Sequence, residues 1–182
     1  MSTTEIILLA ILAIVVVAIV AFLFMREKKS RELRDRFGPE YVRTLAATHD
    51  KRKAELSLEK RAQRVKSLRL RSLNHQDRQR YVELWRKVQN EFVDDPSGAF
   101  NKADDLLGDV MAARGYPMSD FEHQAADLSV NHPFVVQHYR AGHEVALRHR
   151  NGEADTEELR RAMIHYRDLF DELVNDAVPA TN

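Results

Sequence analysis

The sequence has no cysteine and few of the residues that interrupt helices. Its 182 residues include 0 Cys, 6 Gly and 5 Pro. Without cysteine, disulfide bonds, thiolate zinc sites and thiol nucleophiles are excluded. The sequence also has no glycine-rich phosphate loop, no dinucleotide fingerprint and no nucleophile elbow. No segment alternates apolar and polar residues for long enough to predict a strand, so we expect an all-α protein.

Charge is absent from the 20 positions Ile6–Met25, which read IILLAILAIVVVAIVAFLFM. About 20 apolar residues in a helix cross a bilayer core of about 30 Å. A cleavable signal peptide has a basic start, a shorter apolar core and small residues at its end. Residues 1–5 contain no Lys or Arg, and the run ends in Phe-Leu-Phe-Met. The run therefore predicts an uncleaved transmembrane helix, with residues 1–25 as the anchor.

Basic residues flank this run on one side only. Those that follow it within the next turns are Arg26, Lys28, Lys29, Arg31, Arg34 and Arg36. The positive-inside rule then predicts that the N-terminus lies outside and that everything after residue 25 is cytoplasmic. The expected location is the inner cell membrane, crossed once.

Residues 26–73 are predicted to form a basic stalk and linker. Phe37-Gly38-Pro39 is expected to end the first helix, and Pro39 to open a second helix that runs to about Ser67. Only a thin apolar seam follows a heptad register there, which favours a long solvated stalk helix, lying partly against the domain, over a coiled coil. Leu68–Leu73 is expected to be a short extended linker.

Five helices are predicted between residues 74 and 174. Four of the expected starts are Asn74 with Asp77, Asp95-Pro96, Ser119 with Glu122, and Asp155 or Thr156. Asn131-His132-Pro133 is expected to separate the third helix from the fourth. Gly115 and Asn151-Gly152 are expected to end two of them. Together they predict a compact antiparallel helical domain of about 100 residues, with a frayed tail over residues 175–182.

Each of these helices carries an apolar stripe at helical spacing, which predicts its buried face. The stripes are Tyr81, Leu84, Trp85, Val88 and Phe92; Phe100, Ala103, Leu106, Leu107, Val110 and Met111; Phe121, Ala125 and Leu128; Val135, Val136, Tyr139, His143, Ala146 and Leu147; and Leu159, Met163, Tyr166, Leu169, Phe170 and Leu173. We expect Trp85 to pack against the last helix, near Leu169 or Phe170.

The net charge of zero hides a strong segregation. Residues 26–90 have 20 Lys/Arg and 9 Asp/Glu, a net of +11, whereas residues 91–182 have 8 and 18, a net of −10; Glu5 completes the balance. A basic stretch beside a membrane suits anionic lipid headgroups. Nucleic-acid binding, pairing within the molecule or between copies, and a merely solvated stalk are the alternatives.

Eight histidines raise the question of a metal site: His49, His75, His123, His132, His138, His143, His149 and His165. No His-x-x-x-His or Glu-x-x-His spacing occurs. His143-Glu144 lacks the second histidine of a zincin, because position 147 is Leu147. His123 and Asp127 have i, i+4 spacing, which chance explains easily. Solvated or capping histidines are favoured, so the sequence assigns no catalytic, cofactor-binding or metal-binding residue and no cofactor.

Four sequence blocks resemble a bacterial family of membrane-anchored helical proteins. They are FGPEYVRT (37–44), RYVELWRKVQNEFVDDP (80–96), RGYPMSDFEHQAADLSVNHP (114–133) and TEELRRAMIHYRDLFDELV (156–174). The resemblance covers about residues 37–174. It implies an N-terminal anchor and a helical domain, and it transfers no function and no residue role.

Two functions from different classes remain open. The sequence favours a membrane-tethered cytoplasmic helical interaction or scaffold module, whose partner is another protein or a second copy of the chain. The rival is an enzyme or metal-dependent module that uses the His-rich segment 123–149. No catalytic motif supports the rival, and membrane tethering disfavours nucleic acid as a partner.

Overall fold

The computed structural model describes residues 3–176, with side chains from residue 11 onward. These residues form α-helices and no strand, which confirms the predicted all-α class. The helices are α1 (Thr3–Phe37), α2 (Pro39–Thr48), α3 (Lys51–Ser67), α4 (His75–Glu91), α5 (Pro96–Ala113), α6 (Phe121–Asn131), α7 (Val136–Arg150) and α8 (Thr156–Asn175). The side chains at 6–10 of the predicted anchor, and most of the predicted tail, lie outside the described residues.

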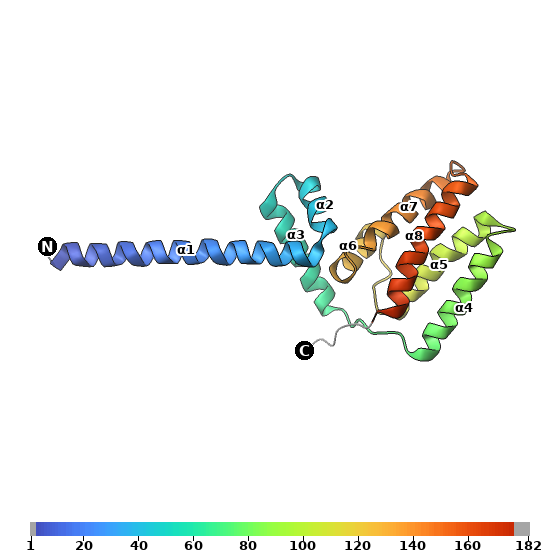
Figure 1. The fold of residues 1–182 in the computed structure, drawn as a ribbon, viewed down its shortest axis with the longest axis horizontal. Coiled ribbons are helices and arrows are strands. Elements are labelled where there is room, and N and C mark those ends of the chain that lie inside the picture. Colours follow the sequence, from blue (N-terminus) through green and yellow to red (C-terminus); the bar gives the residue numbers. More distant parts are fainter. Residues whose placement is uncertain (1–2, 177–182) are drawn as a thin grey trace.

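α1 is one unbroken helix that extends away from the other helices (Figure 1). It carries the apolar run and continues through the charged residues 26–36 without a break. All the described side chains of the run, from Ile11 to Met25, are exposed. Within the described part of the chain, no helix combines the length and the apolar character needed to cross a membrane.

The predicted single stalk helix from Pro39 to Ser67 is wrong. α1 ends at Phe37 as expected, and Gly38 adopts a positive φ of 45° before Pro39 opens α2. The stretch then breaks at His49, whose φ of 52° lies in the left-handed region. The carboxylate of Asp50 accepts hydrogen bonds from the backbone amides of Arg52 and Lys53 and so caps α3. Two short helices replace the rod because the turn lets them pack against each other.

The last turns of α1 pack with α2 and α3 into what we call the hairpin unit. Its small core consists of Leu33, Phe37, Tyr41, Leu58 and Val65, joined by Val130 of α6. A carboxylate ties the three helices together, because Glu55 of α3 accepts hydrogen bonds from Ser30 Oγ of α1 at 2.6 Å and from Tyr41 Oη of α2 at 3.0 Å. The thin apolar seam of the sequence is therefore a packed core and not a solvated stalk.

Helices α4–α8 form what we call the bundle, on the far side of the hairpin unit from the free end of α1 (Figure 1). The predicted caps Asn74, Asp95 and Asp155 are confirmed, and Asp155 forms a complete capping box with Glu158. The predicted start at Ser119 is wrong, since the carboxylate of Asp120 accepts from the amide of His123 and caps α6.

The bundle core contains the predicted contact between the single tryptophan and α8. Trp85 stacks on Phe170 with ring centroids 4.7 Å apart and an interplanar angle of 14°. Leu84 and Leu147, which were predicted inward, are 38% and 47% exposed. α4 packs mainly against α5 and α8, and α7 mainly against α8 and α6, so each buries a narrower face than its apolar stripe suggests.

The segment between the hairpin unit and the bundle is extended from residue 69 to residue 74, as predicted. The end of α5 holds it in place: Arg71 donates from its amide to Arg114 O at 2.9 Å and from Nε to Ala113 O at 2.7 Å. Gly115 is required here, because it has a φ of +91° and a Cβ would lie 2.7 Å from Arg69 O.

Candidate functional site

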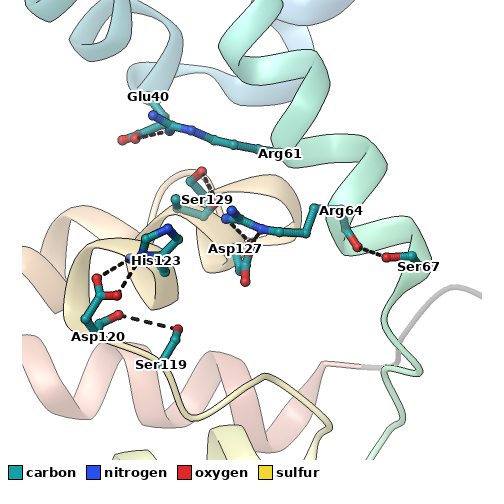
Figure 2. Close-up of polar contacts among 10 residues, drawn as sticks. Glu40, Arg61, Arg64, Ser67, Ser119, Asp120, His123, Asp127 and Ser129 are labelled. Carbon is teal, nitrogen blue, oxygen red and sulfur yellow. Dashed lines mark hydrogen bonds and ion pairs between the residues drawn. The ribbon is translucent and has the colours of Figure 1, made fainter.

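The hairpin unit meets the bundle through buried charges, and we call this contact the charged junction. α3 packs on α6, while α2 places a carboxylate against α7. Arg64 of α3 points across the interface to Asp127 of α6, and Arg61, one turn earlier on α3, pairs with Glu40 of α2 (Figure 2). The acidic side chains at the junction, Glu40 and Asp127, are 1% and 2% exposed.

The centre of the junction is Glu40, which is 1% exposed. Its Oε1 accepts hydrogen bonds from Arg61 Nη1 and Arg140 Nη2, both at 2.9 Å, and its Oε2 accepts from Gln137 Nε2 at 3.1 Å. Burial lowers the pKa of Arg140, and the negative charge of Glu40 opposes that shift. One carboxylate thus joins α2, α3 and α7.

A second ion pair lies beside it. Arg64 approaches Asp127 Oδ1 through Nε at 2.6 Å and through Nη2 at 2.5 Å (Figure 2). The carboxyl side chain of Asp127 is 3% exposed. α6 is the helix between the two cores, because Ala125 and Leu128 belong to the bundle core and Val130 to the core of the hairpin unit.

These pairs are costly to break because their carboxylates are buried, with the Glu40 and Asp127 side chains 1% and 3% exposed. Charges buried between protein layers lose their hydration, and well-placed partners roughly compensate that loss. Removing one partner leaves an uncompensated buried charge, which typically destabilises by about 3–5 kcal/mol. The junction therefore favours one docked arrangement over a sliding apolar contact.

A groove of about 550 Å³ runs beside the junction, between α3 and α6. Its lining comprises Lys53, Leu56, Ser57, Lys60, Arg61, Arg64, Glu122, His123 and Ala126. Arg61 and Arg64 are already paired with Glu40 and Asp127, and His123 Nδ1 lies 2.7 Å from Asp120 Oδ2 (Figure 2). The lining is mostly basic and carries no nucleophile with an adjacent base.

The histidines of segment 123–149 do not converge. His143 stacks on Phe121 with centroids 3.6 Å apart, and His149 meets the edge of Phe100. The closest pair is His138 and His165, whose Nδ1 atoms lie 3.1 Å apart, with Asp168 Oδ2 3.0 Å from His138 Nδ1. Among the described residues, no three His, Asp or Glu side chains are placed to hold a metal ion.

The two sequence pairs considered for metal binding are also not assembled. Asp127 is held by Arg64, while the neighbour of His123 is Asp120, so the i, i+4 pair does not form a site. His143 lines a separate surface pocket with Glu144 and Arg140 and has no second histidine there. Burial lowers the pKa of His143, whose ring stacks on Phe121.

A second polar cluster anchors the end of α8. Arg114 is 1% exposed and donates to Leu173 O at 2.5 Å and to Asp176 Oδ2 at 3.0 Å. His132, which is 2% exposed, lies with Nδ1 3.2 Å from Glu172 Oε1. Burial lowers the pKa of His132, although Glu172 opposes the shift. Because the carbonyls at the end of a helix lack partners within the helix, this cluster serves as a cap.

Little in the sequence points to the charged junction. Glu40 follows Gly38-Pro39 and looks like an ordinary acidic residue in the first turn of a helix. The available sign was Arg140, which lies four residues after Val136 and therefore on the apolar face of its helix. A cation on a buried face needs a buried acid, but the sequence does not say which one.

The comparisons with known proteins return nothing: no family model, curated protein or solved structure matches the chain. The resemblance of its sequence blocks to membrane-anchored helical proteins stays a prediction.

Proposed function

We propose that this protein is a membrane-tethered helical interaction module. In this proposal α1 crosses the inner membrane once, the N-terminus lies outside, and the bundle is presented in the cytoplasm to a protein partner. The observation that carries the proposal is the continuity of α1, which joins the apolar run to Leu33 and Phe37 in the core of the hairpin unit without a break.

The exposure of the apolar run supports the anchor. Phe24 and Met25 are 71% and 70% exposed, and none of the described side chains from Ile11 to Met25 is covered by the rest of the chain. A helix that is apolar on all sides needs apolar surroundings, in a protein core or in lipid. With residues 6–10 the run reaches 20 residues, the length that a bilayer requires.

The packing supports a scaffold in which the bundle is held at a fixed position. A flexible linker would let the bundle drift relative to the membrane. Here Phe37, with 0% exposure, and the charged junction connect α1 to α6 and α7 by packed contacts. A partner that binds the bundle would therefore be brought to a defined height and orientation above the bilayer.

The charge distribution supports a partner with a basic surface. In the described residues, two ion pairs link the basic half to the acidic half, namely Arg64–Asp127 and Glu40–Arg140. Most acidic side chains of the bundle are thus not neutralised by residues 26–90. Electrostatic complementarity would attract a basic partner and speed its binding.

Reporter fusions test the anchor and its orientation. We expect a C-terminal reporter that works only in the cytoplasm to be active, and one that works only outside to be silent. The opposite pattern, or release of the protein from membranes by alkaline carbonate, would overturn the proposal. Chemical crosslinking of the full chain in membranes, followed by identification of captured proteins, tests the interaction role; we expect capture to fall as salt rises.

A further inference from the structure

We propose that a basic collar at the base of the hairpin unit binds the anionic phospholipid headgroups of the membrane leaflet. The collar consists of Arg26, Lys28 and Lys29 of α1 and Lys51, Arg52 and Lys53 of α3, all of them exposed. The inference rests on the proposed anchoring by α1 and names the lipid chemistry that the hairpin unit meets.

The fold brings the start of α3 back toward the membrane. The chain turns sharply at Gly38, and the turn between α2 and α3 lies beside α1 instead of beyond its end (Figure 1). Glu55, one turn into α3, accepts a hydrogen bond from Ser30 Oγ at 2.6 Å, and Lys29 Nζ lies 2.8 Å from Glu59 Oε1. The first turn of α3 therefore lies next to the first charged turn of α1.

This position corresponds to the headgroup layer. Met25 is the last residue of the apolar run, and at 1.5 Å per residue Ser30 lies roughly 7–8 Å beyond it along the axis. A bilayer of about 40–45 Å with a core of about 30 Å leaves a headgroup layer of roughly 5–8 Å on each side. The long side chains of Lys51 and Arg52 can reach that layer from the first turn of α3, and Lys53 beside them also lines the groove between α3 and α6.

Three of the collar cations, Arg26, Arg52 and Lys53, form no ion pair among the described residues. The other three, Lys28, Lys29 and Lys51, lie 3.9, 2.8 and 3.8 Å from Glu32, Glu59 and Glu55, and their side chains are still 71%, 61% and 51% exposed. The pKa of Glu27 is lowered chiefly by its hydrogen bond and charge interaction with Arg31, and Lys51 contributes to the same shift from across the helix pair. Cations in the first turn of a helix oppose its dipole, so these residues do not help α3 itself.

The test uses the full chain in vesicles and exploits the absence of cysteine. A polarity-sensitive dye is attached to Ala47→Cys, an exposed position in the last turn of α2, and in a second sample to Gln89→Cys on α4, at the far end of the bundle. Vesicles of phosphatidylcholine alone are compared with vesicles that also contain phosphatidylglycerol. Quenching is measured with acrylamide in the water and with a lipid that carries a spin label on its headgroup.

We expect the dye at position 47 to lose acrylamide quenching and gain headgroup quenching only in the anionic vesicles. Salt at 1 M, where the screening length is about 3 Å, should reverse both changes. Arg52→Glu/Lys53→Glu should abolish them, whereas the matched pair Arg86→Glu/Lys87→Glu on α4 should leave them intact. Glu in the first turn suits the dipole of α3, so unfolding would not account for the loss.

Carbonate extraction of the same vesicles separates the two proposals. If the chain stays in the bilayer and position 47 is quenched by acrylamide equally in both lipids, the collar inference fails and the anchor stands. Equal protection in neutral vesicles, or an equal effect of the α4 pair, would also overturn it. If carbonate extracts the chain, both proposals fail.

Discussion

Glu40 and Arg140, 100 positions apart in the sequence, form a buried ion pair with 2.9 Å between Oε1 and Nη2. The pair joins α2, next to the proposed anchor, to α7 in the bundle. Arg61 of α3 donates a hydrogen bond to the same carboxylate oxygen of Glu40. Glu40 therefore helps to set the orientation of the bundle relative to α1, together with the Arg64–Asp127 pair and Val130.

We predict that Glu40→Ala loosens the junction. The two guanidinium groups would lose their shared acceptor, which should lower the free energy of unfolding by about 3–5 kcal/mol. Hydrogen exchange of the full chain in detergent micelles should speed up at amides of α2, α3 and α7. Glu32→Ala is the control, because Glu32 is an exposed partner in a surface pair with Lys28 and should change stability by about 0–1 kcal/mol.

A double-mutant cycle separates the Glu40–Arg140 interaction from general damage. Glu40→Gln and Arg140→Gln together should destabilise less than the sum of the single changes, with a coupling of about 0.5–3 kcal/mol. Additive effects in chemical denaturation would mean that the carboxylate is held mainly by Arg61 and Gln137.

We also predict that Trp85→Ala removes a large part of the stability of the bundle. Truncating a core tryptophan typically costs about 3–5 kcal/mol, and the stacking partner Phe170 would lose its neighbour. Circular dichroism during denaturation measures the loss. In the unchanged chain the single tryptophan should emit at short wavelength and resist quenching by iodide, since it is 5% exposed. Leu84→Ala, one residue away and 38% exposed, should cost far less.

Helix starts in the bundle could be predicted because their causes are local. Asn74, Asp95 and Asp155 each accept a hydrogen bond from the amide three residues further on, a spacing that the sequence itself displays. The Trp85–Phe170 contact followed from apolar spacing on two helices. Ser119 failed as a cap because Asp120, a stronger acceptor next to it, took the position.

The hairpin and the charged junction could not be predicted in the same way. The break at His49 involves neither glycine nor proline, and it depends on the packing of Tyr41 and Leu58 after the chain has reversed. The ion pairs of Glu40 join residues 21 and 100 positions apart, a separation that no local pattern reports. Charge segregation suggested pairing between the halves, yet it did not identify Arg64 and Asp127 as partners.

Replacing two helical glycines by alanine should change the stability of the protein in opposite directions. Gly142 in α7 lies under the ring of Tyr166, and a Cβ there would overlap the ring, so Gly142→Ala should destabilise by about 1–3 kcal/mol. Gly108 in α5 has room, with Met118 Cε 3.6 Å from a Cβ, so Gly108→Ala should stabilise by roughly 0.5–1 kcal/mol. Thermal unfolding compares the two, and a loss of the same size at both sites would contradict the packing of α7 on α8.

The last prediction concerns acid. Burial lowers the pKa of His132, and also those of His143 and His165, below the ordinary value of 6.5. Below pH 6.5 these histidines therefore bind protons more readily in the unfolded chain than in the folded chain. By linkage, the free energy of unfolding should be highest above pH 6.5 and should decrease as the pH falls below that value. The slope should reach at most about 1.4 kcal/mol per pH unit for each histidine.

The slope of stability against pH isolates His132, because it does not depend on the absolute cost of a substitution. Urea denaturation between pH 7.5 and pH 5 should give a shallower slope for His132→Asn than for the unchanged chain, since the unfolded state then has one site fewer to protonate. His75→Asn, at an exposed position that starts α4, is the matched control and should keep the original slope. If His132→Asn also kept it, protonation of His132 would be equally favourable in both states, and its burial against Arg114 and α8 would have no part in acid sensitivity.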